Sequence, residues 1–132
     1  MIGLDTNVLL RVFVIDDGEQ SRQALRFFAR ECSSTTPGYV NCVVLAEVIW
    51  VLDTSYRYTR DAIARIVAQL LDTEDIRIEA RDEVAAALRA YPKASVNFTD
   101  ILIAELNRRA GCSATATFDR KAARLDGFKL LR

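Results

Sequence analysis

The sequence predicts an α/β fold with a mainly parallel central sheet of four to five short strands flanked by helices, in a Rossmann-like arrangement. Short apolar segments of strand length alternate along the chain with longer segments whose apolar residues recur at helical spacing. No repeat, low-complexity tract or linker interrupts this alternation. The chain has 132 residues, which suits one domain, and we expect that domain to span residues 1–132.

A short apolar strand opens the chain at residues 1–4. Residues 7–14 are interpreted as a helix, although their apolar run is too continuous for spacing alone to decide. Residues 19–32 have clearer amphipathic spacing, with arginines on the polar face. The predicted apolar stripe of this helix consists of Ala24, Leu25, Phe28 and Ala29. Residues 35–41 combine a turn with a short strand.

The middle of the chain is the most apolar part. Residues 43–56 predict a buried helix, and residues 59–72 predict an amphipathic helix that Thr59 can cap. The alternating residues 76–79 then indicate a short strand.

Stop signals mark the helices of the second half. Residues 81–91 predict a helix, and Pro92 directly after them ends it. Residues 98–111 predict another helix, with Gly111 at the position of a left-handed cap.

Residues 114–118 and 128–131 are the last predicted strands, separated by a helical turn at 119–125 and a turn at Asp126-Gly127. In parallel sheets, ligands bind beyond the carboxyl ends of the strands. Asp5 directly follows the first strand and Asp119 directly follows residues 114–118. Both acids are therefore expected at the edge where a site forms.

The composition limits the chemistry available at such a site. The chain contains 18 basic and 18 acidic residues, so its net charge gives no sign of nucleic-acid binding. It has no histidine, and its three cysteines (Cys32, Cys42 and Cys112) form no close pair. A zinc site and histidine-based catalysis are therefore not expected. Hydrolysis would have to use carboxylates, lysines, hydroxyls or a metal ion.

The sequence also indicates the cellular compartment in which the protein acts. Asp5 interrupts the N-terminal apolar run before a signal peptide could form. The longest later run, residues 43–52, is too short to span a bilayer and contains Glu47. Three cysteines in odd number favour reduced thiols. We expect a cytoplasmic protein with no membrane contact.

Glu47 is the most informative acid, because its neighbours on both sides are apolar. We expect it to lie on a buried helix face with Val43, Val44, Trp50 and Val51. A buried carboxylate needs a partner, which is either an arginine or a metal ion. Alternatively, Glu47 lies at the edge of the helix, where its carboxylate reaches solvent.

Three further acids each have a simple structural explanation when taken alone. Asp100 suits the first turn of its helix, and Asp5 and Asp119 can cap helices. Asp100 also shares a face with Ile103 and Ala104, which we expect to point inward. Four carboxylates converging on one sheet edge would require cations, and oxygen ligands select Mg²⁺ or Mn²⁺. Such a site suits phosphodiester hydrolysis.

Four segments together resemble the PIN-domain nucleases, and most closely the VapC-type toxins of bacterial toxin–antitoxin pairs. They are LDTNVLLR, AEVIWVL, NFTDILIAE and TFDRKAARLDGFKLL, in the order and spacing of that family. The resemblance implies that Asp5, Glu47, Asp100 and Asp119 are catalytic, metal-binding acids of a Mg²⁺-dependent endoribonuclease. It also implies an RNA substrate, a cognate antitoxin and a homodimer. Many relatives carry Asp where this chain has Asn97, which lowers the local negative charge.

Residues beside the acids are candidates for supporting roles. Thr6, Asn7, Asn97 and Thr117 can hydrogen-bond the acids, or equally serve as turn and cap residues. Basic residues close to the acids in sequence can hold the RNA backbone or form a solvated helix face; they are Arg11, Arg120, Lys121 and Arg124. Base stacking would use Tyr39, Tyr56 or Tyr58.

Three alternatives stay open from the residues alone. A receiver-like, Mg²⁺-binding phosphoacceptor domain would use Asp16, Asp17 and Asp53, and it requires residues 11–15 to be a strand. A haloacid-dehalogenase-type phosphatase needs a second aspartate where this chain has Asn7. A catalytically silent PIN scaffold would bind RNA or a partner without cleaving.

Overall fold

The structure is a computed structural model that describes residues 1–14 and 18–132. Helices and strands alternate along the chain, and every pair of hydrogen-bonded strands in the described residues is parallel. The predicted α/β class is therefore confirmed. The chain forms two compact units, Met1–Glu79 and Ala80–Arg132, which are described in turn.

The sheet of the first unit contains β1 (Ile2–Gly3), β2 (Gly38–Val40) and β3 (Ile76–Ile78), in that order. Ile2 lies opposite Gly38, and Gly38 lies opposite Ile76. Because all three strands run the same way, their carboxyl ends share one edge of the sheet. Asp5 follows β1 at that edge, as the sequence predicted.

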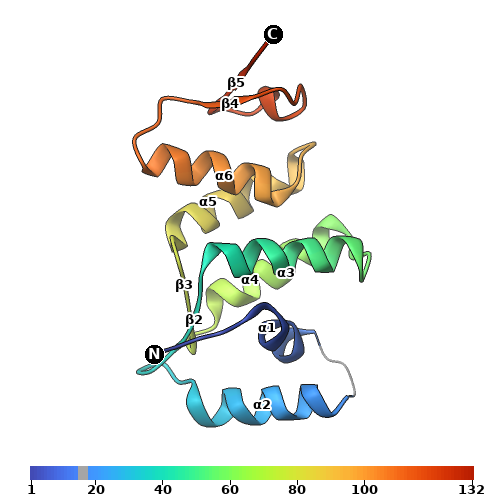
Figure 1. The fold of residues 1–132 in the computed structure, drawn as a ribbon, viewed down its shortest axis with the longest axis vertical. Helices are drawn as coiled ribbons and strands as arrows, with labels where there is room; N and C mark the ends of the chain where they lie inside the picture. The colour runs from blue at the N-terminus through green and yellow to red at the C-terminus, as the bar shows by residue number, and fades with distance from the viewer. Residues whose placement is uncertain (15–17) are drawn as a thin grey trace. The chain divides into compact units, whose positions relative to one another are not determined.

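Four helices complete the first unit: α1 (Thr6–Phe13), α2 (Glu19–Glu31), α3 (Cys42–Thr54) and α4 (Arg60–Asp72). α1 lies between α2 and α3 (Figure 1). Thr59 caps α4 as predicted, because its hydroxyl accepts a hydrogen bond from the Ala62 N–H at 3.1 Å. The fully buried side chains from these helices include Leu9, Leu45, Leu52, Ile63, Val67 and Leu70.

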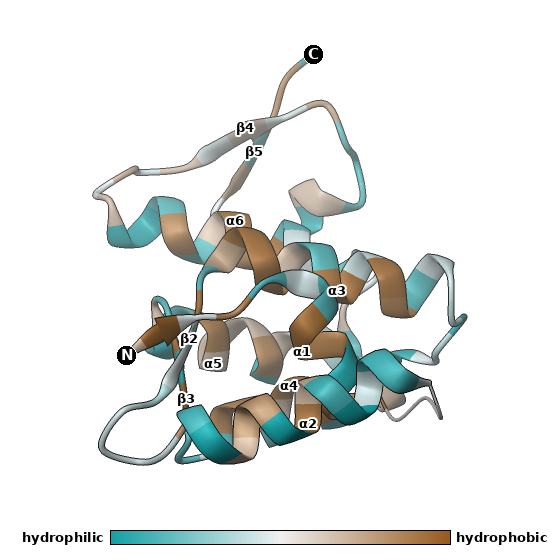
Figure 2. Cartoon of the chain, turned by 60° about the horizontal axis from the view of Figure 1, so that its bottom comes forward, coloured by the Kyte–Doolittle hydropathy of each residue, from teal (hydrophilic) through white to brown (hydrophobic). Residues whose placement is uncertain are grey.

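α2 differs from its predicted amphipathic pattern. Its buried residues are Ser21 and Ala24, whereas Leu25 is 41% exposed and Ala29 is exposed. The prediction is therefore right for Ala24, which is buried, and for Phe28, which is half-buried, and wrong for Leu25 and Ala29. Figure 2 shows hydrophilic residues along much of this helix.

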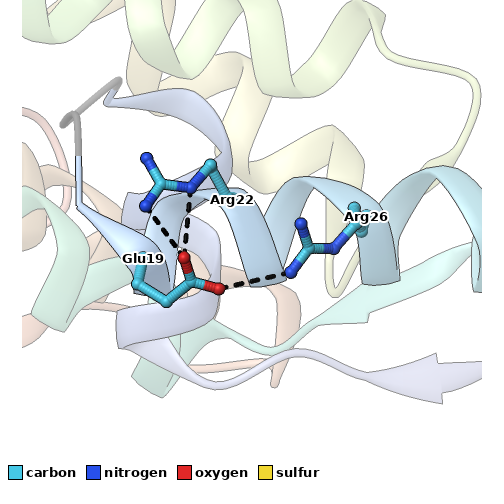
Figure 3. Close-up of polar contacts among 3 residues, drawn as sticks. All are labelled: Glu19, Arg22 and Arg26. Carbon is cyan, nitrogen blue, oxygen red and sulfur yellow. Dashed lines mark hydrogen bonds and ion pairs between the residues drawn. The ribbon is translucent and has the colours of Figure 1, made fainter.

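The first turn of α2 carries a small ion-pair network on its exposed side. Glu19 accepts hydrogen bonds from Arg22 at 2.8 Å and from Arg26 at 3.4 Å (Figure 3). Arg30 pairs with Glu31 at the other end of the helix. The arginines of this face are thus matched by acids of the same helix.

The second unit contains α5 (Arg81–Ala90), α6 (Phe98–Arg109), β4 (Thr115–Thr117) and β5 (Phe128–Leu130), with short 3₁₀ turns at Tyr91–Lys93 and Ala122–Arg124. α5 starts after Ala80, whose backbone is left-handed at φ 53°. α5 and α6 pack together, and Arg109 pairs with Glu83 at 3.2 Å. Gly111 ends α6 at φ 98°, which confirms the predicted cap.

The five strands of the described residues form two hydrogen-bonded sheets, with three strands in the first unit and two in the second. In the second unit, Thr115 lies opposite Phe128 and Thr117 opposite Leu130. α6 is held to β4 by Asn107, whose side-chain amide donates to the Thr115 hydroxyl at 2.9 Å. Among the described helices, none has the length and apolar character needed to cross a bilayer.

Candidate active site

Thr6 brings two of the four predicted acids together. Asp5 is the N-cap of α1, and its carboxylate accepts a hydrogen bond from the Thr6 N–H at 2.8 Å. The Thr6 hydroxyl donates to Glu47 Oε2 on α3, also at 2.8 Å. One residue therefore contacts a carboxylate on either side, and acids 42 positions apart in the numbering meet at the carboxyl edge of the sheet.

The predicted burial of Glu47 is wrong. Glu47 is exposed, and its helix face includes Val43 at 69% and Trp50 at 64% exposure. The buried side of α3 is instead formed by Leu45, Val48, Ile49 and Leu52. Glu47 therefore needs no buried partner for its charge, and its position beside Asp5 follows from the hydrogen bond to Thr6.

The donor set around Thr6 suits a hard divalent cation. Asp5 and Glu47 each use one carboxylate oxygen in the bonds to Thr6, and these bonds leave the second oxygen of each for a cation. Both side chains are exposed, so a hydrated ion can reach them. Oxygen ligands of this kind favour Mg²⁺ or Mn²⁺ over softer metals.

Asp100 lies in the first turn of α6 and is half-buried. Asn97 is the N-cap residue of this helix, and its carbonyl accepts from the Asp100 N–H at 3.1 Å. The face of Asp100 is mixed, because Ala104 is buried while Ile103 is 42% exposed. We expected both residues to point inward; this is right for Ala104 and wrong for Ile103.

Asp119 organises the turn that follows β4. Its Oδ1 accepts hydrogen bonds from the Lys121 N–H at 2.8 Å and the Ala122 N–H at 3.4 Å. Its own N–H donates to the Thr117 hydroxyl at 3.0 Å. Asp119 thus bonds the backbone at the start of this turn, but the helical segment is shorter than predicted, spanning Ala122–Arg124 with Lys121 as its N-cap residue. Thr117 steadies the same turn.

The four acids are divided between the two units, with Asp5 and Glu47 in the first and Asp100 and Asp119 in the second. Within each unit by itself, the described residues include no group of three or more carboxylate or thiol side chains that could hold a metal ion. Neither unit alone therefore carries the four-acid set predicted from the sequence.

Two surface depressions are lined by two of the four candidate basic residues, Arg11 and Arg120. Asn7 and Arg11 line a mainly apolar depression of about 310 Å³ between α1 and α2. Gln20, Gln23 and Phe27 also line it, and they were not singled out from the sequence. Arg120 lines a second depression, which belongs to the C-terminal part of the second unit.

The tyrosines proposed for base stacking are partly engaged elsewhere. Tyr56 and Tyr58 contact each other edge-to-face, with ring centroids 5.9 Å apart. Tyr39 is half-buried on β2. Lys121 and Arg124 are exposed beside the Asp119 turn.

The family of the chain follows from comparison with known proteins. The family model of the PIN domain matches residues 2–128, which is nearly the whole chain. The chain belongs to the PIN-domain family. It is also similar to a VapC ribonuclease from Aquifex aeolicus (strain VF5), with 27% identity over 126 residues, covering 96% of this chain and 92% of that protein. The resemblance predicted from the four segments is thereby confirmed.

The receiver-like alternative does not fit this PIN domain. It requires residues 11–15 to be a strand, but residues 11–13 are the last turn of α1. Asp53 lies within α3 and not at the end of a strand. Asp16 and Asp17 lie outside the residues that the structure describes.

Sequence reasoning missed Phe118 in this PIN domain. Residues 114–118 were predicted as a strand and Phe118 was assigned no role, yet its side chain is 78% exposed. A signal was present, because Phe118 directly precedes Asp119 and a basic pair, Arg120-Lys121.

Proposed function

We propose that this PIN domain is a Mg²⁺-dependent endoribonuclease, with Mn²⁺ as an alternative ion, and the toxin of a type II toxin–antitoxin pair. The observation that carries the proposal is the Thr6 contact with both Asp5 and Glu47, two acids of the predicted set. Family membership and the similarity to a VapC ribonuclease support it.

The proposed roles divide among the acids and their neighbours. Asp5, Glu47, Asp100 and Asp119 would hold the ion, directly or through water. Bound Mg²⁺ would activate a water molecule and stabilise the leaving oxygen. Thr6 orients Glu47 by donating to its carboxylate, which leaves the other carboxylate oxygen for binding. Candidate supports for the acids or the RNA are Asn7, Arg11, Asn97, Thr117 and Arg120.

The absence of histidine from the sequence agrees with this chemistry. Histidine is the usual general base near neutral pH, and a chain without it needs another way to activate water. Carboxylates that position a metal ion provide such a way.

The first test is cleavage of a labelled single-stranded RNA by the purified chain, with Mg²⁺ or with EDTA. We expect cleavage only with Mg²⁺, and equal cleavage under both conditions would exclude a metal mechanism. The variant Asp5→Asn should lose more than about 100-fold in rate, since a ligand charge is removed. It should stay folded, because an asparagine oxygen can still accept from the Thr6 N–H.

A silent PIN scaffold predicts a different result in the same test. Such a protein would bind the RNA without cutting it under either condition, and Asp5→Asn would change nothing.

The proposed partners are a small antitoxin and a second copy of the chain, acting in the cytoplasm. Expression of the chain alone should arrest growth, and co-expression with the product of an adjacent short gene should relieve the arrest. Sedimentation of the purified chain should give the mass of a dimer, about twice 14.8 kDa.

A further inference from the structure

Phe118 stands out on the surface of the second unit. At 78% exposure, it is the most exposed of the large hydrophobic side chains in the described residues. It lines a depression of about 530 Å³ together with Arg120, Leu130, Leu131 and Arg132. An aromatic ring thus shares an open surface site with two guanidinium groups.

The backbone beneath this site is held in place. The Asp119 carboxylate bonds two backbone N–H groups, and the Thr117 hydroxyl bonds a third. Phe118 and Arg120 flank Asp119 directly. Their side chains therefore project from a turn whose conformation is set by the proposed metal ligand itself.

The local charge differs from that of the whole chain. Between residues 115 and 132 there are five basic and two acidic side chains, a surplus of three positive charges in a chain that is neutral overall. The basic residues are Arg120, Lys121, Arg124, Lys129 and Arg132. A single-stranded polyanion with flat rings fits a surface of this composition, because bases stack on aromatic rings and phosphates pair with arginines.

We infer that Phe118 stacks on an unpaired base of the RNA substrate and that Arg120 binds an adjacent phosphate. The inference rests on the proposed function and names a substrate contact beside Asp119. The stacked nucleotide lies next to Asp119, which is a proposed metal ligand of the same unit, so this contact helps to decide which phosphate of the RNA is presented to that acid.

The test measures RNA binding without cleavage. A fluorescent single-stranded oligoribonucleotide is titrated with the full chain in EDTA, and its anisotropy is followed. Phe118→Ala should weaken the Kd by about 5- to 150-fold, the range of one lost base stack. Phe118→Trp should keep the affinity within about threefold, because stacking is retained.

Arg120→Ala should lower the salt dependence of binding by one phosphate contact, a change of about 0.7 in the slope of log K against log salt. Arg89→Ala, an exposed arginine on α5, serves as the matched control and should leave the slope unchanged.

A set of oligoribonucleotides with one abasic position each makes the test specific for stacking. At one position, loss of the base should weaken binding to the wild type but not further weaken binding to Phe118→Ala. Far-ultraviolet circular dichroism should show the variants folded, since the ring is mostly exposed.

Three outcomes separate the two proposals. If Phe118→Ala binds RNA as the wild type does while the wild type cleaves with Mg²⁺, the stacking contact is wrong and the proposed function stands. If Phe118→Ala weakens binding but the wild type never cleaves, the nuclease proposal fails and the RNA contact stands. If Phe118→Ala abolishes dimer formation but leaves RNA binding unchanged, the ring contacts protein and the inference is overturned.

Discussion

Thr6 occupies a position where one short side chain serves both the fold and the candidate site. Its N–H is satisfied by the Asp5 cap of α1, and its hydroxyl reaches Glu47 on α3. Glu47 is exposed, so the bond is not needed to satisfy a buried charge. What the bond supplies is orientation, since it holds one carboxylate oxygen of Glu47 on the Thr6 hydroxyl.

Replacing Thr6 tests this orienting role. Thr6→Val keeps the branched shape and the backbone cap but removes the donor to Glu47. RNA cleavage or the apparent Mg²⁺ affinity should fall about 10- to 100-fold, as for other groups that orient metal ligands. Thr6→Ser keeps the hydroxyl and should retain most activity. Equal activity of the valine variant and the wild type would show that Glu47 needs no such support.

Burial also determines how reactive each cysteine is. Burial, with smaller contributions from Asp75 and Glu31, raises the pKa of the Cys32 thiol above its ordinary value of 9.0. Cys112 is exposed. At pH 8, iodoacetamide should therefore modify Cys112 first and Cys32 only on unfolding, as mass spectrometry of the labelled peptides would reveal.

The raised pKa of Cys32 also makes the stability of the chain depend on pH. When pH rises through 9.0, the unfolded thiol loses its proton before the folded one does. The free energy of unfolding should then decrease with increasing pH, and the Cys32→Ala variant should lack this contribution. Early labelling of Cys32 in the native state would contradict the burial on which both expectations depend.

In β2, neighbouring side chains pack directly against the backbone of Gly38. A methyl group on Gly38 would come within 2.7 Å of Leu4 Cδ1 and 3.1 Å of Cys32 Sγ. Leu4 and Cys32 are both buried, so neither side chain can move into solvent. Leu4 also directly precedes Asp5, which couples the packing of β2 to the position of an acid.

Gly38→Ala should accordingly destabilise the chain by about 1–3 kcal/mol, the usual cost of overpacking. Gly3→Ala is the matched control in β1, where a methyl group meets nothing within 4 Å. That control should change the stability by less than about 0.5 kcal/mol. Urea denaturation of both variants measures the difference, and equal midpoints would argue against the tight contact.

For the molecule as a whole, charge is balanced in number but not in distribution. Asp5 and Glu47, the proposed metal ligands of the first unit, are both negatively charged. Residues 115–132 carry the opposite surplus. Ions that bind the native carboxylates should therefore shift the folding equilibrium, whereas ions that only screen charge should have a smaller effect.

Thermal unfolding with and without Mg²⁺ measures this shift. At one hundred times its Kd, Mg²⁺ should stabilise the native chain by about 2.7 kcal/mol. Sodium chloride at equal ionic strength is the control, and Asp5→Asn should lose most of the Mg²⁺ effect. A melting temperature that is the same in Mg²⁺ and in sodium chloride would count against a preformed site.

Much of the fold could be predicted because local signals mark where elements begin and end. Thr59, Pro92 and Gly111 place helix ends within one or two residues of those observed. These residues act through their own backbone and nearest neighbours, so sequence alone reveals them.

The side of a helix that faces the interior was harder to predict. In α3 nearly every residue is apolar, so spacing gives no preferred stripe, and tertiary packing selects Leu45, Val48 and Leu52. Glu47 was therefore assigned to the wrong environment, and its role as a metal ligand stays a prediction. The exposure of Phe118 depends in the same way on contacts that no local pattern encodes.

The hydrogen bond from Thr6 to Glu47 also joins residues that the ribosome synthesises seconds apart. It joins residues that are 41 positions apart. A ribosome adding about 5–20 residues per second needs about 2–8 seconds to make that interval. Throughout those seconds both groups of the local cap, the Asp5 carboxylate and the Thr6 N–H, are present in the nascent chain, but the companion acid has not yet been synthesised. The groups of the cap are thus complete before those of the acid pair.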